Sequence, residues 1–183
     1  MSNLFQQLEI EAFRAGITPR TKESMDWFRR KATQLGRVGK SIMNDEAVKL
    51  QTSMKDPVGN MYMFFYDPKH KKTLPYYDKF PLIIMIGPAK GGFYGLNLHY
   101  LPPTLRAVVL DNLLAEDNKE VAVKNVPNKY IAPMIKHYLT DHVKSRFALV
   151  DKPEWEIATF LPTAQFEKAS ASTVYTNSKR MIK

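Results

Sequence analysis

The fold is decided by the stretch Leu74-Pro-Tyr-Tyr-Asp-Lys-Phe-Pro-Leu-Ile-Ile-Met-Ile-Gly-Pro-Ala-Lys-Gly-Gly-Phe-Tyr-Gly-Leu-Asn-Leu-His-Tyr-Leu-Pro-Pro103. It holds two apolar runs, residues 79–86 and 93–99, on either side of the glycine-rich segment 87–92. Two apolar runs of strand length about a short turn predict an antiparallel hairpin. The closing prolines predict a helix over residues 104–114, because the first helical turn leaves its N–H groups unbonded and proline has none to lose.

The glycines of this turn do not form a phosphate-binding loop. That loop requires a Lys-Ser or Lys-Thr pair that opens a helix after the last glycine, whereas here a second apolar run follows Gly92. A tight turn between strands is the better interpretation, and the stretch gives no sign of a catalytic centre.

The four histidines also lack the spacing of a catalytic or metal site. None of His70, His99, His137 and His142 lies in an H-E-x-x-H pattern. His137 and Asp141 have the spacing of two ligands on one helix, but no third ligand accompanies them. His99, beside Tyr100, is better interpreted as a packed or hydrogen-bonded residue than as a base. We expect no metal, no cofactor and no enzymatic activity.

The composition is that of one ordinary domain with extensions. The chain has 183 residues, 44% of them hydrophobic, and no cysteine, which excludes disulfides, thiolate nucleophiles and cysteine-ligated metals. The N-terminus has no signal-peptide pattern, and the longest apolar run, residues 81–86, is far too short to cross a bilayer. We therefore expect a soluble protein without a membrane partner, made in the cytoplasm.

The net charge of +9 is concentrated near the two ends of the chain. Residues 14–40 carry a local charge of +6 and residues 163–183 a local charge of +3, while the remainder is close to neutral. Such clustering predicts an electrostatic partner, either nucleic acid or an acidic protein surface. The candidate partner-contact residues are Arg29, Arg30, Arg37, Lys40, Phe166, Tyr175, Lys179, Arg180 and Lys183.

Periodicity and turn residues predict an α+β fold: a small antiparallel sheet with flanking helices, an N-terminal helical segment and an extended C-terminal arm. Helices are expected at residues 3–15, 19–35, 104–114 and 129–144, and strands at 60–66, 79–86, 93–99, 146–150 and 155–160. Residues 118–126 are expected to form a surface connection. The chain divides into a basic helical segment, 1–40, a core domain, 41–162, and an arm, 163–183, too polar to order itself.

Two features leave a nucleic-acid role open. The segment Lys69-His-Lys-Lys72 forms a basic tip that is either simply solvated or in contact with phosphate. Aromatic residues such as Tyr62, Phe64, Tyr76 and Tyr100 lie on or near the strands. They are either core residues or stacking platforms for bases.

The segments Leu74-Pro-Tyr-Tyr-Asp-x-Phe-Pro-Leu82 and Gly95-Leu-Asn-Leu-His-Tyr-Leu-Pro102 resemble small virion proteins of contractile-tailed bacteriophages. The resemblance covers roughly residues 60–115. It implies a structural protein of the virion, assembled in the host cytoplasm, with no enzymatic site to carry over.

We therefore expect a non-enzymatic subunit of a phage tail, baseplate or neck, whose charged ends make protein–protein contacts with other virion subunits in a large hetero-oligomer. The alternative is a nucleic-acid-binding protein that contacts packaged DNA near the portal or the tail entrance. The two differ in salt dependence, since phosphate contacts weaken steeply with salt and apolar interfaces do not.

Overall fold

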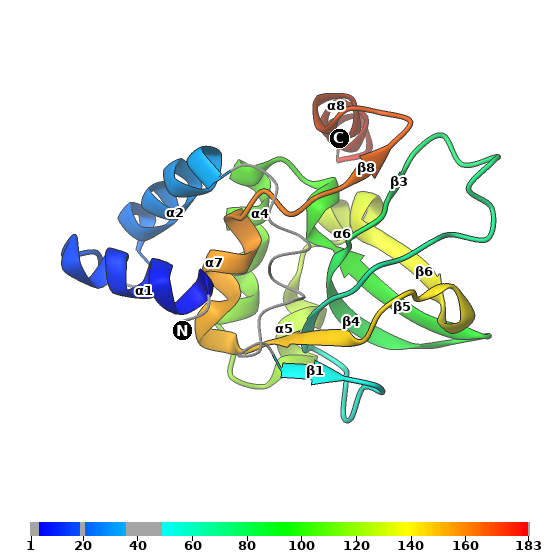
Figure 1. The fold of residues 1–183 in the computed structure, drawn as a ribbon, viewed down its shortest axis with the longest axis horizontal. Helices are drawn as coiled ribbons and strands as arrows, with labels where there is room; N and C mark the ends of the chain where they lie inside the picture. The colour runs from blue at the N-terminus through cyan, green and yellow to red at the C-terminus, as the bar shows by residue number, and fades with distance from the viewer. Residues whose placement is uncertain (1–3, 19–20, 36–48, 183) are drawn as a thin grey trace.

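The computed structural model describes residues 4–18, 21–35 and 49–182 (Figure 1). The helices are α1 (Leu4–Arg14), α2 (Lys22–Leu35), α4 (Pro103–Leu114), α5 (Lys119–Asn125), α6 (Asn128–Met134), α7 (Trp155–Phe160) and α8 (Ala171–Met181). The strands are β1 (Lys49–Gln51), β2 (Met61–Met63), β3 (Tyr77–Asp78), β4 (Leu82–Ala89), β5 (Gly92–Asn97), β6 (Ile135–Leu139), β7 (Phe147–Val150) and β8 (Phe166–Glu167). Three short 3-10 turns are η1 (Leu98–Tyr100), η2 (Thr140–His142) and η3 (Lys152–Glu154).

The main sheet is antiparallel throughout, with the strand order β1-β7-β2-β4-β5-β6, and β3 pairs with β8 in a separate two-stranded sheet. The hairpin β4–β5 and the helix α4 confirm the predicted strand, turn, strand and helix. The predicted α+β class is likewise confirmed.

The approach of β6 to the hairpin requires glycine at position 92. A Cβ built on Gly92 would lie 1.8 Å from the carbonyl oxygen of Tyr138, so any side chain would separate the two strands. The turn itself is shorter than predicted: Ala89 still pairs with Gly92, and Gly91 takes a left-handed φ of 73°. The remaining glycine-rich residues continue β4, past a bulge between Met85 and Gly87.

The two faces of the sheet are buried differently. Side chains that alternate along a strand point to opposite faces, so Met61 and Met63 join the helices in one core while Tyr62 and Phe64 belong to another. The second core is rich in aromatic rings. Phe64, for example, meets Phe93, Tyr138 and Phe147 at centroid distances of 5.3–5.8 Å. Tyr62 and Phe64 are therefore core residues, which is one of the two interpretations offered by the sequence.

Helices α4, α5 and α7 cover the first face, and α1 and α2 pack on the outside of α7 (Figure 1). Phe5, Leu8 and Phe28 are buried in the same core as the sheet residues. A buried hydrogen bond between Ser24 and Glu156 links α2 to α7. The division of the chain at residues 40 and 162 stays a prediction.

Two predicted elements take the opposite structure. The segment predicted as a helix over residues 129–144 is α-helical only in α6 and then continues as the edge strand β6. It forms a strand because its backbone pairs with that of β5. The predicted strand at residues 155–160 is the helix α7, and all six of its residues are buried. A segment buried on every side shows no periodicity that separates a helix from a strand. Within the predicted surface connection, Asn118 caps the short helix α5.

The expected extended C-terminal arm is wrong. Residues 163–182 form β8 and α8, and they fold onto their own chain (Figure 1). Val174 and Ser178 are buried, and Ser170 caps the helix by accepting a hydrogen bond from the backbone N–H of Thr173. A few buried anchors and a cap suffice because strand β3 and helix α6 provide ready partners.

Candidate nucleic-acid interface

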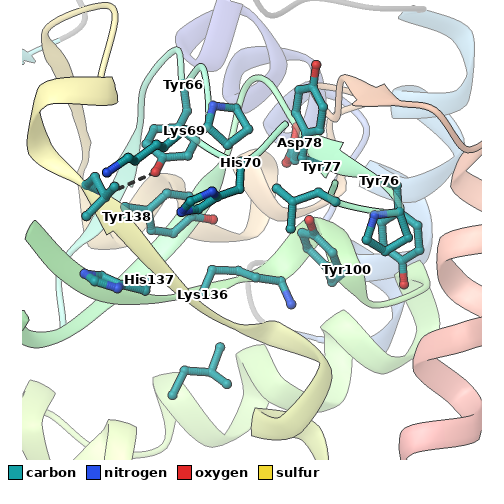
Figure 2. A pocket seen from close by; sticks show the side chains of 15 residues that line it. Tyr66, Lys69, His70, Tyr76, Tyr77, Asp78, Tyr100, Lys136, His137 and Tyr138 are labelled. Atoms are coloured by element: carbon teal, nitrogen blue, oxygen red, sulfur yellow. Dashed lines mark hydrogen bonds between the residues drawn. The ribbon is translucent and has the colours of Figure 1, made fainter. Parts of the chain in front are cut away.

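A cavity of about 680 Å³ lies between the segment 66–78, strand β6 and Tyr100 (Figure 2). Figure 2 shows Tyr76 and Tyr100 together at one end and Tyr66 with Lys69 at the other. Pockets that bind small molecules or cofactors have volumes of about 300–1,000 Å³. The cavity is therefore of a size to hold one nucleotide, and we call it the tyrosine pocket.

Local hydrogen bonds hold the basic tip, residues 69–72, beside this pocket. Lys71 pairs with Asp67 at 2.8 Å, and the backbone N–H groups of Thr73 and Leu74 donate to the carbonyl of His70. Lys168 Nζ donates to the carbonyls of Lys72 and Leu74, at 2.9 Å each. The C-terminal segment therefore fixes the loop, and the exposed cations of the tip stay at the pocket rim.

The tyrosines form a continuous aromatic wall. The ring centroids of Tyr76 and Tyr100 are 6.0 Å apart, and the ring of Phe166 meets Tyr100 edge-on at 5.3 Å. Tyr100 is buried, whereas Tyr76 and Tyr77 are half-buried, and all three line the cavity. Rings supported from behind and open in front suit planar ligands such as bases.

Lys136 places a positive charge inside the pocket. Its Nζ lies 4.1 Å from the ring centroid of Tyr100 and donates to the carbonyl of Pro133 at 2.9 Å. No carboxylate of the described residues forms an ion pair with it. Burial lowers the pKa of Lys136 to about 8. The ammonium is therefore a charged donor at neutral pH, and a bound anion would compensate its lost hydration.

Behind the pocket, Asp78, His99 and Thr163 form a buried polar cluster. His99 Nδ1 donates to Asp78 Oδ2 at 2.7 Å, and His99 Nε2 accepts from Thr163 Oγ1 at 2.8 Å. Asp78 also accepts from the side chain of Asn97 and from the backbone N–H of Gln165. These bonds join β3, the end of β5 and the C-terminal segment, and so fix the floor of the pocket.

The charges in this cluster follow from burial and hydrogen bonding. Burial lowers the pKa of His99 more than Asp78 raises it, so the imidazole is neutral. Burial opposes ionisation of Asp78, yet His99 and the amide donors hold the pKa of Asp78 below its ordinary value. Carboxylate, imidazole and hydroxyl follow one another as in a hydrolytic triad. Since Thr163 and His99 expose no surface, the cluster is arranged for structure.

The predicted partner-contact residues do not meet at one place. Arg30 is exposed on α2, while Lys179 and Arg180 are exposed on α8, and Figure 1 places these helices apart. Phe166 and Tyr175 are half-buried: Phe166 packs on Tyr100, and the hydroxyl of Tyr175 accepts from Arg106 at 2.8 Å. The side chain of Arg29 and the residues Arg37, Lys40 and Lys183 lie outside the described part of the structure. A role of these residues in partner contacts stays a prediction.

Two cations lie where the sequence pattern does not predict them. The pattern of residues 129–144 predicts a helix, whereas Lys136 lies on the edge strand β6 with its Nζ over the ring of Tyr100. Arg106 is 4% exposed and donates to the carbonyls of Leu101 and Thr159 and to Tyr175. The available signal was the basic tip at residues 69–72, whose nearness to the tyrosines only the fold reveals.

Within residues 4–18, 21–35 and 49–182, no cluster of three or more histidine, aspartate or glutamate side chains is arranged to hold a metal ion. Among these same residues, no helix has both the length and the apolar character needed to cross a bilayer.

The family model described as phage T4 terminal DNA protecting protein matches residues 5–182 of the chain. No curated protein and no solved structure matches this chain. The match covers nearly the whole chain, whereas the resemblance to small virion proteins of contractile-tailed bacteriophages covers roughly residues 60–115. It confirms the association with bacteriophages but names no tail or baseplate subunit.

Proposed function

The chain belongs to the family of the phage T4 terminal DNA protecting protein, and from this premise we propose that it binds the ends of phage DNA and shields them in the virion. The protein that gives the family its description protects terminal DNA. This favours the second of the two functions weighed above, contact with DNA, over a subunit of the tail, baseplate or neck.

The observation that carries the proposal is the basic tip fixed beside the tyrosine pocket. Lys69, His70 and Lys72 are exposed, and Lys136 adds a charge inside. The acidic residues nearby are already engaged: Asp67 pairs with Lys71 and Glu167 with Lys79. Phosphate groups bind to such unmatched cations, and each contact releases counterions from the DNA.

Protection in this proposal is physical rather than chemical. A protein seated on a DNA end blocks an exonuclease by occupying the terminus, and it needs no active site to do so. This agrees with the expected absence of enzymatic activity. Contacts with other virion subunits remain part of the proposal, with the exposed cations of α8 as their candidate surface.

The test is an exonuclease assay on linear duplex DNA with the full chain present. Protection should slow digestion from the ends and leave cleavage by an endonuclease at internal sites unchanged. Equal inhibition of both nucleases would indicate general coating of DNA and would contradict the proposal.

A salt titration locates the contact surface. Replacing two cations of the tip, Lys69→Ala with Lys72→Ala, should reduce the slope of log affinity against log salt by about 2. The matched control is the pair Lys124→Ala with Lys129→Ala, which removes two exposed lysines of α5 and α6. If the control lowers the slope as much as the tip variant, the tip is not the DNA-binding surface.

A further inference from the structure

We infer that the tyrosine pocket binds the terminal nucleotide of a DNA strand, with the base against Tyr76 and the phosphate at Lys136. The inference rests on the proposed function and adds how an end is told from the interior of a duplex.

The size of the pocket imposes this distinction. A cavity of about 680 Å³ accepts one nucleotide and excludes a duplex. A base inside a duplex reaches such a pocket only after it is unpaired and unstacked, and this costs least for a nucleotide that is already single-stranded. A terminal nucleotide lacks a stacking neighbour on one side, so it enters more readily than an internal one.

The aromatic wall provides the surface for the base. The ring of Tyr100 is covered by Lys136 on one side, with Nζ 4.1 Å from the centroid, which leaves the base to the half-buried Tyr76. Tyr76 is supported by Tyr100 at 6.0 Å, so its ring is held in place before any ligand arrives. Stacking on an aromatic ring tolerates every base, which suits a protein that recognises ends and not sequences.

Lys136 provides the contact for the phosphate. Of its three N–H donors, one goes to the carbonyl of Pro133, and Tyr100 takes up one face of the ammonium. A donor remains for a ligand. A terminal phosphate has a second ionisation near pH 6 and so carries up to two negative charges, whereas a phosphodiester carries one. The carboxylate of Asp78 in the floor is already bonded to His99, Asn97 and two backbone N–H groups, so Lys136 and the exposed cations of the rim are the groups that attract a phosphorylated end.

The test compares linear DNA that carries 5′-phosphorylated single-stranded ends with a covalently closed circle of the same sequence. The variants Tyr76→Leu and Lys136→Met should each weaken binding to the linear DNA by about tenfold and leave binding to the circle unchanged. Tyr76→Phe keeps the ring and should retain wild-type binding. An equal effect on both DNAs, or no effect on either, overturns the inference.

Matched controls lie outside the pocket. Lys129 also lies over a tyrosine, with Nζ 5.1 Å from the ring of Tyr130, and Tyr94 is 41% exposed on β5. Lys129→Met and Tyr94→Leu should change neither the affinity for linear DNA nor that for the closed circle. Loss of end preference in these controls as well would show that the pocket has no special part in it.

A second measurement separates this inference from the proposed function. The full chain is titrated with a deoxynucleoside 5′-monophosphate, and separately with the deoxynucleoside and with inorganic phosphate. The nucleotide should bind at least tenfold more tightly than either part, and Lys136→Met should abolish the difference. If the wild-type protein protects ends but shows no nucleotide binding in the pocket, the proposed function stands and the inference is wrong. If the nucleotide binds and the pocket variants weaken binding to linear DNA alone, but the wild-type protein does not slow the exonuclease, the proposed function fails while the pocket assignment stands.

A 5′-hydroxyl version of the linear DNA identifies the phosphate that Lys136 contacts. Weaker binding of this DNA, by a factor that disappears in Lys136→Met, assigns the contact to the terminal phosphate. If the 5′-phosphate and 5′-hydroxyl DNAs bind equally, and Lys136→Met still weakens binding to linear DNA, Lys136 contacts the first phosphodiester. The terminal nucleotide then remains the ligand.

Discussion

The buried polar cluster of Asp78, His99 and Thr163 and the tyrosine pocket adjoin one another, since Asp78 also lines the pocket, and both combine aromatic, basic and hydrogen-bonding side chains. In the cluster, each ring nitrogen of His99 and each carboxylate oxygen of Asp78 has a partner within the chain. In the pocket, Lys136 has no carboxylate partner among the described residues, and Tyr76 and Tyr77 keep open surface. Polar groups that are fully partnered hold the fold together, and those that are not are available for a ligand.

The largest effect on stability is expected when the central carboxylate of the cluster is removed. In Asp78→Ala, the backbone N–H groups of Phe80 and Gln165 and the side chains of Asn97 and His99 lose their common acceptor. Buried donors left without partners cost stability, and we expect the free energy of unfolding to fall by about 4 kcal/mol.

Urea denaturation measures this change, with Asp117→Ala as the control. Asp117 is fully exposed and 3.8 Å from Lys152, so its loss should cost less than about 0.5 kcal/mol. Equal effects of the two substitutions would mean that the cluster is not structurally important.

Acidification tests the same cluster without substitution. Burial lowers the pKa of His99, so the folded protein binds fewer protons than the unfolded chain, in which a histidine titrates near pH 6.5. Stability contributed by neutral His99 is complete above about pH 6.5 and is lost as the pH falls below it, by up to about 1.4 kcal/mol per pH unit. Between pH 6.5 and pH 4.5 we therefore expect the free energy of unfolding to fall steadily as the pH is lowered, because the pKa of His99 is lower in the folded protein.

Unfolding curves at pH 7.5, 6.5, 5.5 and 4.5 give the slope of the free energy of unfolding against pH. His99→Gln should flatten it, whereas His70→Gln, at an exposed position of the basic tip, should leave it unchanged. A wild-type stability that stays constant over this range would show that folding does not lower the pKa of His99.

A smaller effect is expected where the C-terminal helix meets the core. Tyr175→Phe removes the hydroxyl that accepts from Arg106 Nη2 at 2.8 Å. The same nitrogen also donates to the carbonyl of His99, at 3.3 Å, so the guanidinium keeps part of its bonding. We expect the free energy of unfolding to fall by about 1.5 kcal/mol, the lower part of the range for a hydrogen bond to a charged group.

Tyr94→Phe is the control, because that side chain is 41% exposed. A single cooperative unfolding transition in both variants would confirm that α8 belongs to the same folding unit as the sheet. A separate early transition in Tyr175→Phe would instead restore the idea of an independent C-terminal segment.

The smallest change in stability is expected in the pocket. Lys136→Met keeps a side chain of similar length against Tyr100 and removes a half-buried charge that has no carboxylate partner among the described residues. The lost contact with the ring and the relieved desolvation oppose one another, and the free energy of unfolding should change by less than about 1 kcal/mol. Thermal unfolding of Lys136→Met and of Asp78→Ala, measured side by side, compares the contributions of the two side chains to stability. A loss as large as that of Asp78→Ala would make Lys136 a part of the structural core.

The hairpin β4–β5, the helix α4 and the strand β7 can be predicted from the sequence alone. These elements carry their own signals: apolar runs of strand length, a glycine turn and prolines at a helix start. The sequence also showed the charge, the absence of cysteine and the basic tip at residues 69–72. These features depend on residue type and short-range spacing, which a linear chain already contains.

The strand β6, the helix α7 and the course of the C-terminal segment depend on contacts between distant parts of the chain. Residues 135–139 form a strand because the edge of β5 offers hydrogen bonds, and α7 is buried on all sides, so its apolar residues show no period. The tyrosine pocket arises for the same reason. Tyr76, Tyr100 and Lys136 come from three separate parts of the chain, and their distances depend on strand pairings that no local pattern specifies.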